Sequence, residues 1–167
     1  MTYSIDQAAV PGILQTLGVL SSLLDKAAAH TKARGIKESD LLAYRLAPDM
    51  FDLKRQIQIA TDQAKGCVAR LGGVEVPKYE DTETTIKELK ARIAKTVKFV
   101  KSVKPKQFAG AEGRELVIRV GKGEMHFSGR DYLTGWFQPN FYFHAAAAYM
   151  ILRHAGVAIG KRDFLSA

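Results

Sequence analysis

The sequence predicts an all-α fold, an antiparallel four-helix bundle, with a β-hairpin inserted between the third and the fourth helix. Three observations support this fold. Apolar residues recur at helical spacing in four long stretches, glycines stand at the ends of three of them, and a segment of alternating residues precedes the last. Four amphipathic helices in a chain of 167 residues pack most economically side by side around one core. We therefore expect a single domain, residues 1–167.

The first predicted helix begins after Ser4, a favourable N-cap that forms a capping-box pattern with Gln7. Apolar residues then follow the 3.6-residue period, and Gly35 is a natural stop. The apolar stretch 8–24 is interrupted by proline, glycine and polar residues, so it falls short of a membrane span. No basic segment precedes it, so a secretory signal is not expected either.

The second and third helices are separated by a polar linker that contains Pro77. The second helix is expected to begin at Pro48, because proline is favoured in the first turn, and to end at Gly72–Gly73. The third helix is expected from about Thr82 to Val103, with lysines alternating with aliphatic residues. This spacing gives one apolar stripe and one basic face, which is typical of a solvated bundle helix.

The segment 114–129 predicts the β-hairpin, because alternating and β-branched residues flank the short turn Gly121–Lys122–Gly123. An isolated hairpin is only marginally stable, so we expect it to pack across an end or a side of the helices. The fourth helix is expected to open at Pro139 and to end at Gly156.

Charge and cysteine content limit the classes of partner and compartment. The formal net charge of +8 is compatible with an anionic partner, and much of it lies on the third helix. Nucleic acid is not the expected partner, because Phe99 is the only aromatic residue in that helix. The single cysteine, Cys67, cannot form an internal disulfide, which indicates a buried thiol in a reducing cytoplasm.

The fourth helix carries the residues with the clearest chemical potential. Asn140 and His144 stand one turn apart on its most apolar side, beside four alanines at positions 145–148. His144 is therefore expected to point toward the bundle centre, where the alanines either admit a close neighbour or leave a cavity. A single histidine on an apolar face is more often a hydrogen-bonded core residue than a ligand, because catalytic zinc takes about three protein ligands.

The closing stretch NFYFHAAAAYMILRHAGV, followed by GKRDF, resembles the last helix of the DinB-like superfamily of metal-dependent bundle enzymes. The whole chain is similar to one of its families of unknown function. The resemblance implies a metal held by a His-x-x-x-His pair on the last helix and by a third histidine from the second. His144 matches the second histidine of the pair, and Asn140 stands in place of the first. The second helix has no histidine, and Gln56, with Asp52 next, is the residue expected to face the site.

These departures predict that a zinc or nickel site is lost or weakened, because neutral amides bind transition metals less tightly than imidazole. The leading hypothesis is a small-molecule binding protein with a degenerate metal site. Its central pocket would be lined by Asn140, His144, Gln56, Asp52 and Phe141. The alternative is a metal-dependent transferase or hydrolase with His144 as a ligand. The resemblance implies that relatives with intact metal ligands include thiol-dependent transferases and isomerases. A third possibility is an interaction protein that uses the basic helix.

Aromatic residues are concentrated around the start of the fourth helix, where they can line a pocket or an interface. They are Trp136, Phe137, Phe141, Tyr142 and Phe143. This surplus and the resemblance together lead us to expect a homodimer. After the helix, the segment 160–164 is expected to dock through Phe164, with Asp163 paired locally.

Overall fold

The computed structural model describes residues 3–166, most of which are helical. Four long α-helices, three short ones and one two-stranded antiparallel sheet lie along the described chain, with two 3-10 helices, Pro105–Phe108 and Ala111–Gly113, before the sheet and a π-helical segment, Tyr132–Phe137, after it. In order, the α-helices and strands are α1 (Ile5–Arg34), α2 (Glu38–Leu42), α3 (Leu53–Gly72), α4 (Ile86–Ser102), β1 (Glu115–Val120), β2 (Gly123–Ser128), α5 (Gly129–Asp131), α6 (Gln138–His154) and α7 (Lys161–Leu165). The expectation of a mainly helical chain with a hairpin between its third and fourth long helices is confirmed.

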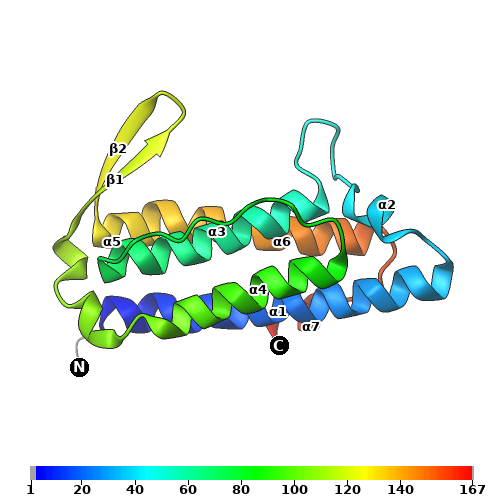
Figure 1. Cartoon of the computed structure of the whole chain (residues 1–167), viewed down its shortest axis with the longest axis horizontal. Helices are drawn as coiled ribbons and strands as arrows, with labels where there is room; N and C mark the ends of the chain where they lie inside the picture. Colours follow the sequence, from blue (N-terminus) through cyan, green and yellow to red (C-terminus); the bar gives the residue numbers. More distant parts are fainter. Residues whose placement is uncertain (1–2, 167) are drawn as a thin grey trace.

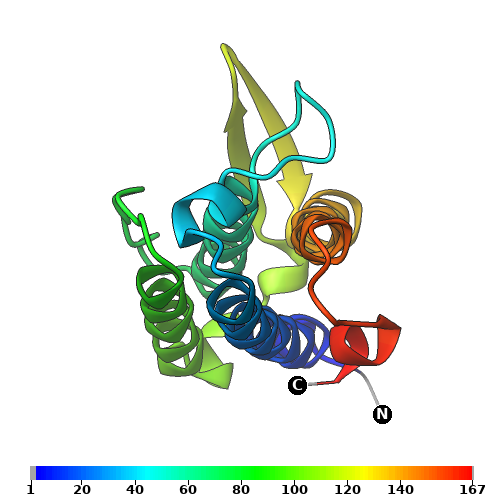
Figure 2. The same ribbon diagram turned by 90° about the vertical axis from the view of Figure 1, so that its right-hand side faces the viewer.

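The long helices lie side by side along the longest axis of the molecule (Figure 1). α3 packs against α6 and α4, and α1 packs against α4, α6 and the short α7. The end-on view places α1 below α3, with α4 on one side and α7 on the other (Figure 2). α7 docks on α1, and the ring of Phe164 lies 5.5 Å from that of Tyr149 on α6. Asp163 was expected to be paired locally. Its carboxylate accepts from the Gly160 N–H at 2.7 Å, but its ion pair is with the distant Lys26 of α1 at 2.5 Å.

The direction of the helices differs from a bundle in which every neighbouring pair is antiparallel. Arg92 of α4 lies beside Thr61 of α3, and Val103 just after α4 lies beside Gly72 at the end of α3, so α3 and α4 run in the same direction. The linker 74–84 makes this possible by returning along the length of α3 before α4 begins (Figure 1). Helical periodicity shows which face is buried but not which way a helix runs.

The start of α3 corrects the sequence prediction. The helix was expected from Pro48, but it begins at Leu53, and Asp52 is its N-cap. The Asp52 carboxylate accepts a hydrogen bond from the backbone N–H of Arg55 at 2.8 Å. A capping carboxylate satisfies a free N–H of the first turn, whereas a proline only lacks one, so the aspartate determines the boundary.

α4 also begins later than expected, at Ile86 rather than near Thr82. Thr85 and Glu88 form a reciprocal capping box. The Glu88 backbone N–H donates to the Thr85 hydroxyl at 3.2 Å, and the Thr85 N–H donates to the Glu88 carboxylate at 3.0 Å. Of the capping box expected at the start of α1, the hydrogen bond from the Ser4 N–H to Gln7 Oε1 is formed at 3.1 Å, whereas the Ser4 side chain makes no capping hydrogen bond.

The helical run that contains α6 starts before Pro139. α5 leads into a π-helical segment, Tyr132–Phe137, which continues directly into α6. Pro139 has no N–H to donate, and a wider turn just before it accommodates this loss. The helix therefore carries its aromatic residues through an irregular segment before it reaches the regular turns at His144.

The hairpin projects from one end of the helices (Figure 1). Its turn is centred on Gly121–Lys122, with Gly121 at φ 58°, a conformation that favours glycine. Leu116 and Ile118 of β1 are buried at its base, and Phe127 of β2 packs against the neighbouring aromatic rings of the α6 run. The rest of the hairpin is exposed, so it packs only at its base.

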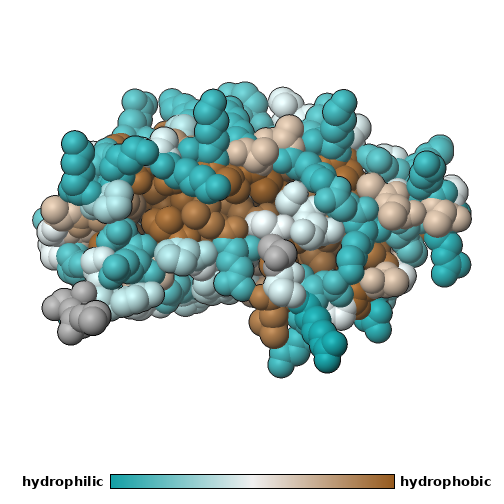
Figure 3. All heavy atoms as spheres, turned by 90° about the horizontal axis from the view of Figure 1, so that it is seen from below, coloured by the Kyte–Doolittle hydropathy of each residue, from teal (hydrophilic) through white to brown (hydrophobic). Residues whose placement is uncertain are grey.

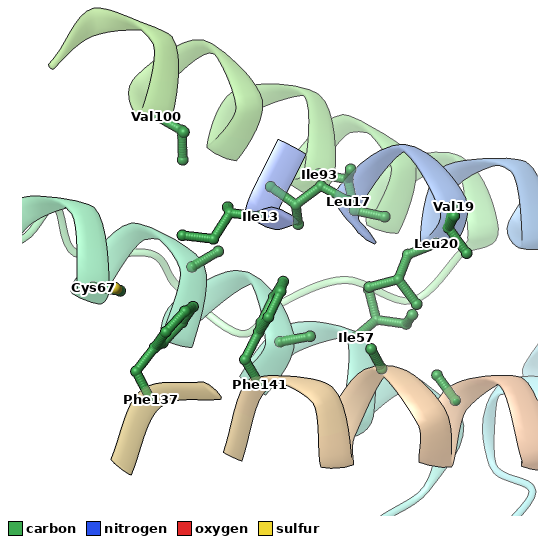
Figure 4. Close-up of a cluster of buried hydrophobic side chains, with 14 of the residues drawn as sticks. Ile13, Leu17, Val19, Leu20, Ile57, Cys67, Ile93, Val100, Phe137 and Phe141 are labelled. Atoms are coloured by element: carbon green, nitrogen blue, oxygen red, sulfur yellow. The ribbon is translucent and has the colours of Figure 1, made fainter. Parts of the chain in front are cut away.

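The core is formed where the long helices face one another (Figure 4). Ile13 and Leu17 of α1, Ile57 of α3 and Phe141 of α6 converge there. The Phe141 ring stacks on that of Phe137, with centroids 5.2 Å apart. Truncating such fully buried side chains to alanine costs about 2–5 kcal/mol in other proteins, so this packing supplies much of the stability.

The apolar stretch 8–24 was expected to fall short of a membrane span, but by length and composition α1 is able to cross a membrane, although 44% of its most apolar window is buried inside the protein. The buried residues of the helix contribute to the core. On the face seen from below, apolar surface remains visible between rows of hydrophilic side chains (Figure 3).

Candidate functional site

The structure brings His144 of α6 and Gln56 of α3 together, although they lie far apart in the sequence. His144 Nδ1 is 2.7 Å from Gln56 Oε1. Gln56 is 1% exposed, and its Nε2 donates to the Phe51 carbonyl oxygen at 3.2 Å. Gln56 is therefore held by a backbone contact on one side and by the histidine ring on the other.

These contacts determine which nitrogen of His144 carries the proton. Because Gln56 uses its amide N–H for Phe51, its oxygen faces the ring, and Nδ1–H must be the donor to it. Nε2 of a neutral ring then has a free lone pair. Every buried side-chain nitrogen and oxygen of residues 3–166 has a hydrogen-bond partner, and the bonded ring nitrogen of His144 is Nδ1. Nε2 therefore reaches the surface of this half-buried residue as an acceptor.

The surroundings keep this ring neutral. Burial lowers the pKa of His144 below its ordinary value, and the nearby positive charge of Arg55 lowers it further. Arg55 lies next to Gln56 on α3 and is paired with Asp81 of the linker. The site thus combines an uncharged acceptor nitrogen with a neighbouring guanidinium.

Two exposed aromatic rings contact residues of the site, Phe143 at His144 and Phe51 at Arg55. The Phe143 ring meets the His144 ring edge to face, with centroids 5.3 Å apart, and the Arg55 guanidinium lies 5.9 Å from the centroid of the Phe51 ring. Phe51 and Phe143 are 53% and 54% exposed, which is unusual for side chains of this size. The sequence does not single out Arg55 and Phe51, because only the fold shows that the charge of Arg55 acts on His144 and that the Phe51 carbonyl oxygen accepts from Gln56.

The remaining predicted site residues occupy three different environments. Asn140 is half-buried one turn before His144, and its side-chain N–H donates to the Trp136 carbonyl oxygen at 2.7 Å. Asp52 lies at the start of α3, where it caps the helix and faces Arg45 at 3.7 Å. Phe141 is fully buried against Phe137 in the core. The structure therefore places His144, Gln56 and Asn140 on facing helices but assigns Phe141 to packing and Asp52 to capping.

The residues present do not fit a zinc or nickel centre of the type that the resemblance implies. Within residues 3–166, no group of three or more His, Cys, Asp or Glu side chains is placed to hold a metal ion. Gln56 Oε1 already accepts from His144, and the Asp52 carboxylate caps α3. The imidazole of His144 is then the one strong metal ligand at this position, whereas a stable zinc centre needs about three protein ligands.

A second polar cluster, not anticipated from the sequence, surrounds Arg92 of α4. Its side chain is 2% exposed and forms ion pairs with Asp62 at 2.8 Å and with Asp81 and Glu83 at 3.0 Å. Its Nε donates to the Thr61 hydroxyl at 2.7 Å. The sequence feature that could have indicated this cluster is the position of Arg92 at the edge of the apolar side of its helix, because a buried charge there requires partners of opposite charge. This cluster holds the linker against α3 and α4.

Comparisons with known proteins agree with the fold. The model of a family described as Domain of unknown function (DUF1993) matches residues 5–165. A crystal structure described as a DinB family member protein from Shewanella denitrificans is 38% identical, with a TM-score of 0.89 over 95% of this chain and 90% of that chain. No curated protein matches the sequence. The resemblance to DinB-like proteins stated from the last helix is confirmed.

Proposed function

The chain belongs to the DUF1993 family, and from that membership we propose that it is a DinB-like protein that binds a small molecule at His144 without a resident metal. The observation that carries the proposal is the hydrogen bond between His144 Nδ1 and Gln56 Oε1. It orients the ring and leaves Nε2 as a neutral acceptor between two long helices. A degenerate metal site of this kind still presents one oriented polar atom, Nε2 of His144, to a ligand.

The chemistry around Nε2 indicates what a ligand would need. A neutral imidazole nitrogen accepts a hydrogen bond from a hydroxyl, amide or protonated amine. The rings of Phe51 and Phe143 offer apolar and aromatic contact, and Arg55 favours a ligand with electron-rich or negatively charged groups. We therefore favour a small aromatic or apolar molecule that carries a hydrogen-bond donor.

The alternative is a metal-dependent transferase or hydrolase in which His144 is a ligand. One observation favours it: ligating histidines usually donate their second ring nitrogen to a neighbouring acceptor, as His144 does to Gln56. The alternative requires water, Asn140 or a rearranged Asp52 to complete the ligand set. That requirement makes it the second candidate.

One set of samples tests both functions. Ligand-observed NMR with a library of small aromatic molecules would compare the native protein with His144→Ala and with His154→Ala, a matched control at the exposed end of α6. Hits that disappear only in His144→Ala support the proposal, and hits unaffected by either change contradict it. Near-stoichiometric zinc or nickel in untagged protein, lost in His144→Ala, would establish the alternative instead.

We also infer that the four long helices form one four-helix bundle as a single domain, joined by the crossover linker. The outer side of α6 supports a homodimer, because Tyr142, Phe143 and Met150 are 41%, 54% and 44% exposed. Light scattering at several concentrations tests this. A cytoplasmic location is proposed from Cys67, whose thiol is buried and has its pKa raised by burial, so it is suited to remaining reduced.

A further inference from the structure

α4 presents a row of lysines to solvent. At about 100° per residue, Lys87, Lys98 and Lys101 fall within about 60° of one another, and Lys95 lies at the edge of the same face. All four are exposed, and the row spans about 21 Å at 1.5 Å per residue. Within residues 3–166, none of the four forms an ion pair, whereas Lys90 on the neighbouring flank pairs with Asp25. The helix therefore carries a stretch of uncompensated positive charge.

A hollow of about 420 Å³ lies against the first half of α4, between this helix and the linker. It is lined on the helix side by Glu88, Ala91, Arg92 and Lys95, and on the linker side by Lys78, Tyr79, Glu80, Thr82 and Glu83. Its volume is in the range of small binding pockets. Lys95 belongs to both the hollow and the lysine row, so the two features form one continuous surface.

The charges that line the hollow itself are balanced. Arg92 is fully paired with its surrounding carboxylates, among them Glu83, and donates to the Glu80 carbonyl oxygen at 3.0 Å. Glu88 accepts the N–H groups just before α4 and keeps its negative charge. At the mouth of the hollow Lys78 and Lys95 balance the carboxylates of Glu80 and Glu88, so the excess positive charge offered to a partner comes from the lysine row along α4.

Tyr79 fixes the position of the Lys95 ammonium at the mouth of the hollow. The Lys95 ammonium lies 4.2 Å from the centroid of the Tyr79 ring, and the buried Lys65 ammonium lies 4.5 Å from it. Cation–π contacts of this kind hold a lysine in place without neutralising its charge. Lys95 is thereby presented to an incoming anion.

We propose that the hollow and the lysine face of α4 together form a docking surface for an acidic segment of a partner protein. A row of about 21 Å is longer than a small anion but matches several carboxylates along a peptide. Nucleic acid fits less well, because the only arginine in this surface, Arg92, is fully paired, and the Tyr79 ring already contacts two ammonium groups instead of being free to stack on a base.

The test measures fluorescence anisotropy of a labelled oligoglutamate peptide in low-salt buffer with the full chain. Binding that weakens as salt is added is expected. The triple variant Lys95→Glu, Lys98→Glu and Lys101→Glu should weaken it about tenfold or more, because each change replaces attraction with repulsion at the contact. Amide shifts induced by the peptide should fall on α4 and on residues 78–83.

A control triple with the same change in net charge separates contact from general attraction. It places glutamate at three exposed lysines elsewhere, Lys32, Lys122 and Lys161. Binding to this control should stay within about twofold of native. Equal weakening by both triples, shifts confined to other helices, or absence of binding at low salt would overturn the proposal. Tighter binding of a single-stranded oligonucleotide than of oligoglutamate would also overturn it and would assign the face to nucleic acid.

Discussion

Arg92 of α4 and Asp81 of the linker form an ion pair at 3.0 Å, and the second oxygen of Asp81 pairs with Arg55 of α3. One linker carboxylate therefore connects the buried arginine to the guanidinium whose charge lowers the pKa of His144. The crossover linker is part of the folded core, and it links the two polar regions of the molecule.

Replacing Arg92 with leucine is expected to lower the free energy of unfolding by about 1–3 kcal/mol. The change leaves the largely buried Glu83 without its cation, whereas the more exposed Asp62 and Asp81 keep Lys65 and Arg55 as partners. Urea denaturation followed by circular dichroism measures the loss. Arg119→Leu is the matched control, because the Arg119–Glu124 pair on the hairpin is exposed and should change stability by less than about 1 kcal/mol. Equal effects of the two changes would contradict the role assigned to Arg92.

Glu83 makes stability depend on acid pH. Burial raises the pKa of its carboxyl, but hydrogen bonds from Gln58 and Arg92 lower it more, so the pKa lies below its ordinary value. A carboxyl with a lowered folded-state pKa stabilises the protein above its unfolded pKa, and this contribution is lost as pH falls through the folded pKa. Melting temperature should therefore fall below about pH 4.5, less steeply in Glu83→Gln. An unchanged slope in the variant would show that other carboxyls govern acid unfolding.

Local chemistry made the long helices and the hairpin predictable. Capping residues at Ser4, glycines such as Gly35 and Gly73 and the 3.6-residue period each act within a few residues of the chain. The start of α3 was wrongly predicted at Pro48, because a proline and a capping aspartate both favour a helix start in this segment. The Asp52 cap is the stronger of the two signals. The shared direction of α3 and α4 was not predictable, since it depends on how the linker packs and not on any local pattern.

The candidate site was partly predictable for the same reason. His144 and Gln56 were expected on facing helices from their faces and from the resemblance, and they meet at 2.7 Å. Arg55 and Phe51 were missed, because their contribution depends on the start of α3 and on the path of the linker. Phe141 was placed in the pocket because it shares the apolar side with His144, but a fully apolar side chain on that side joins the core.

The neutral state of His144 should be visible in an NMR pH titration. Burial, and then the charge of Arg55, lower its pKa, so its ring resonances should titrate at lower pH in the folded protein than in the protein unfolded by urea. The linked contribution to stability is present above the unfolded pKa of about 6.5 and is lost as pH falls below it. Replacing Gln56 with leucine should remove the preference for a proton on Nδ1. Identical titration of His144 in the folded and the unfolded protein would show that the ring is not held as the structure indicates.

Gly129 is expected to tolerate no side chain. A β-carbon there would lie far inside van der Waals contact with the Ala111 carbonyl oxygen, at the close approach that anchors the hairpin to the helices. Gly129→Ala should therefore destabilise the protein by at least about 1–3 kcal/mol. Gly135→Ala, where the added carbon meets open space, is the control and should leave the melting temperature nearly unchanged. A neutral Gly129→Ala would mean that the hairpin can move away from its base without cost.

Asn140→His tests whether the asparagine at position 140, in place of a histidine, is the reason why zinc binds weakly at this site. The change restores two imidazoles one turn apart on α6, an arrangement in which both can reach one ion. Zinc affinity measured by isothermal titration calorimetry should rise about tenfold or more over native, because imidazole replaces a neutral amide. The double change with Gln56→His should raise it further, provided the fold is kept, since α3 then supplies a third nitrogen facing His144. If neither variant binds zinc better than the native chain, the facing positions are too far apart to share an ion, and the likeness to a metal-binding helix ends at the sequence.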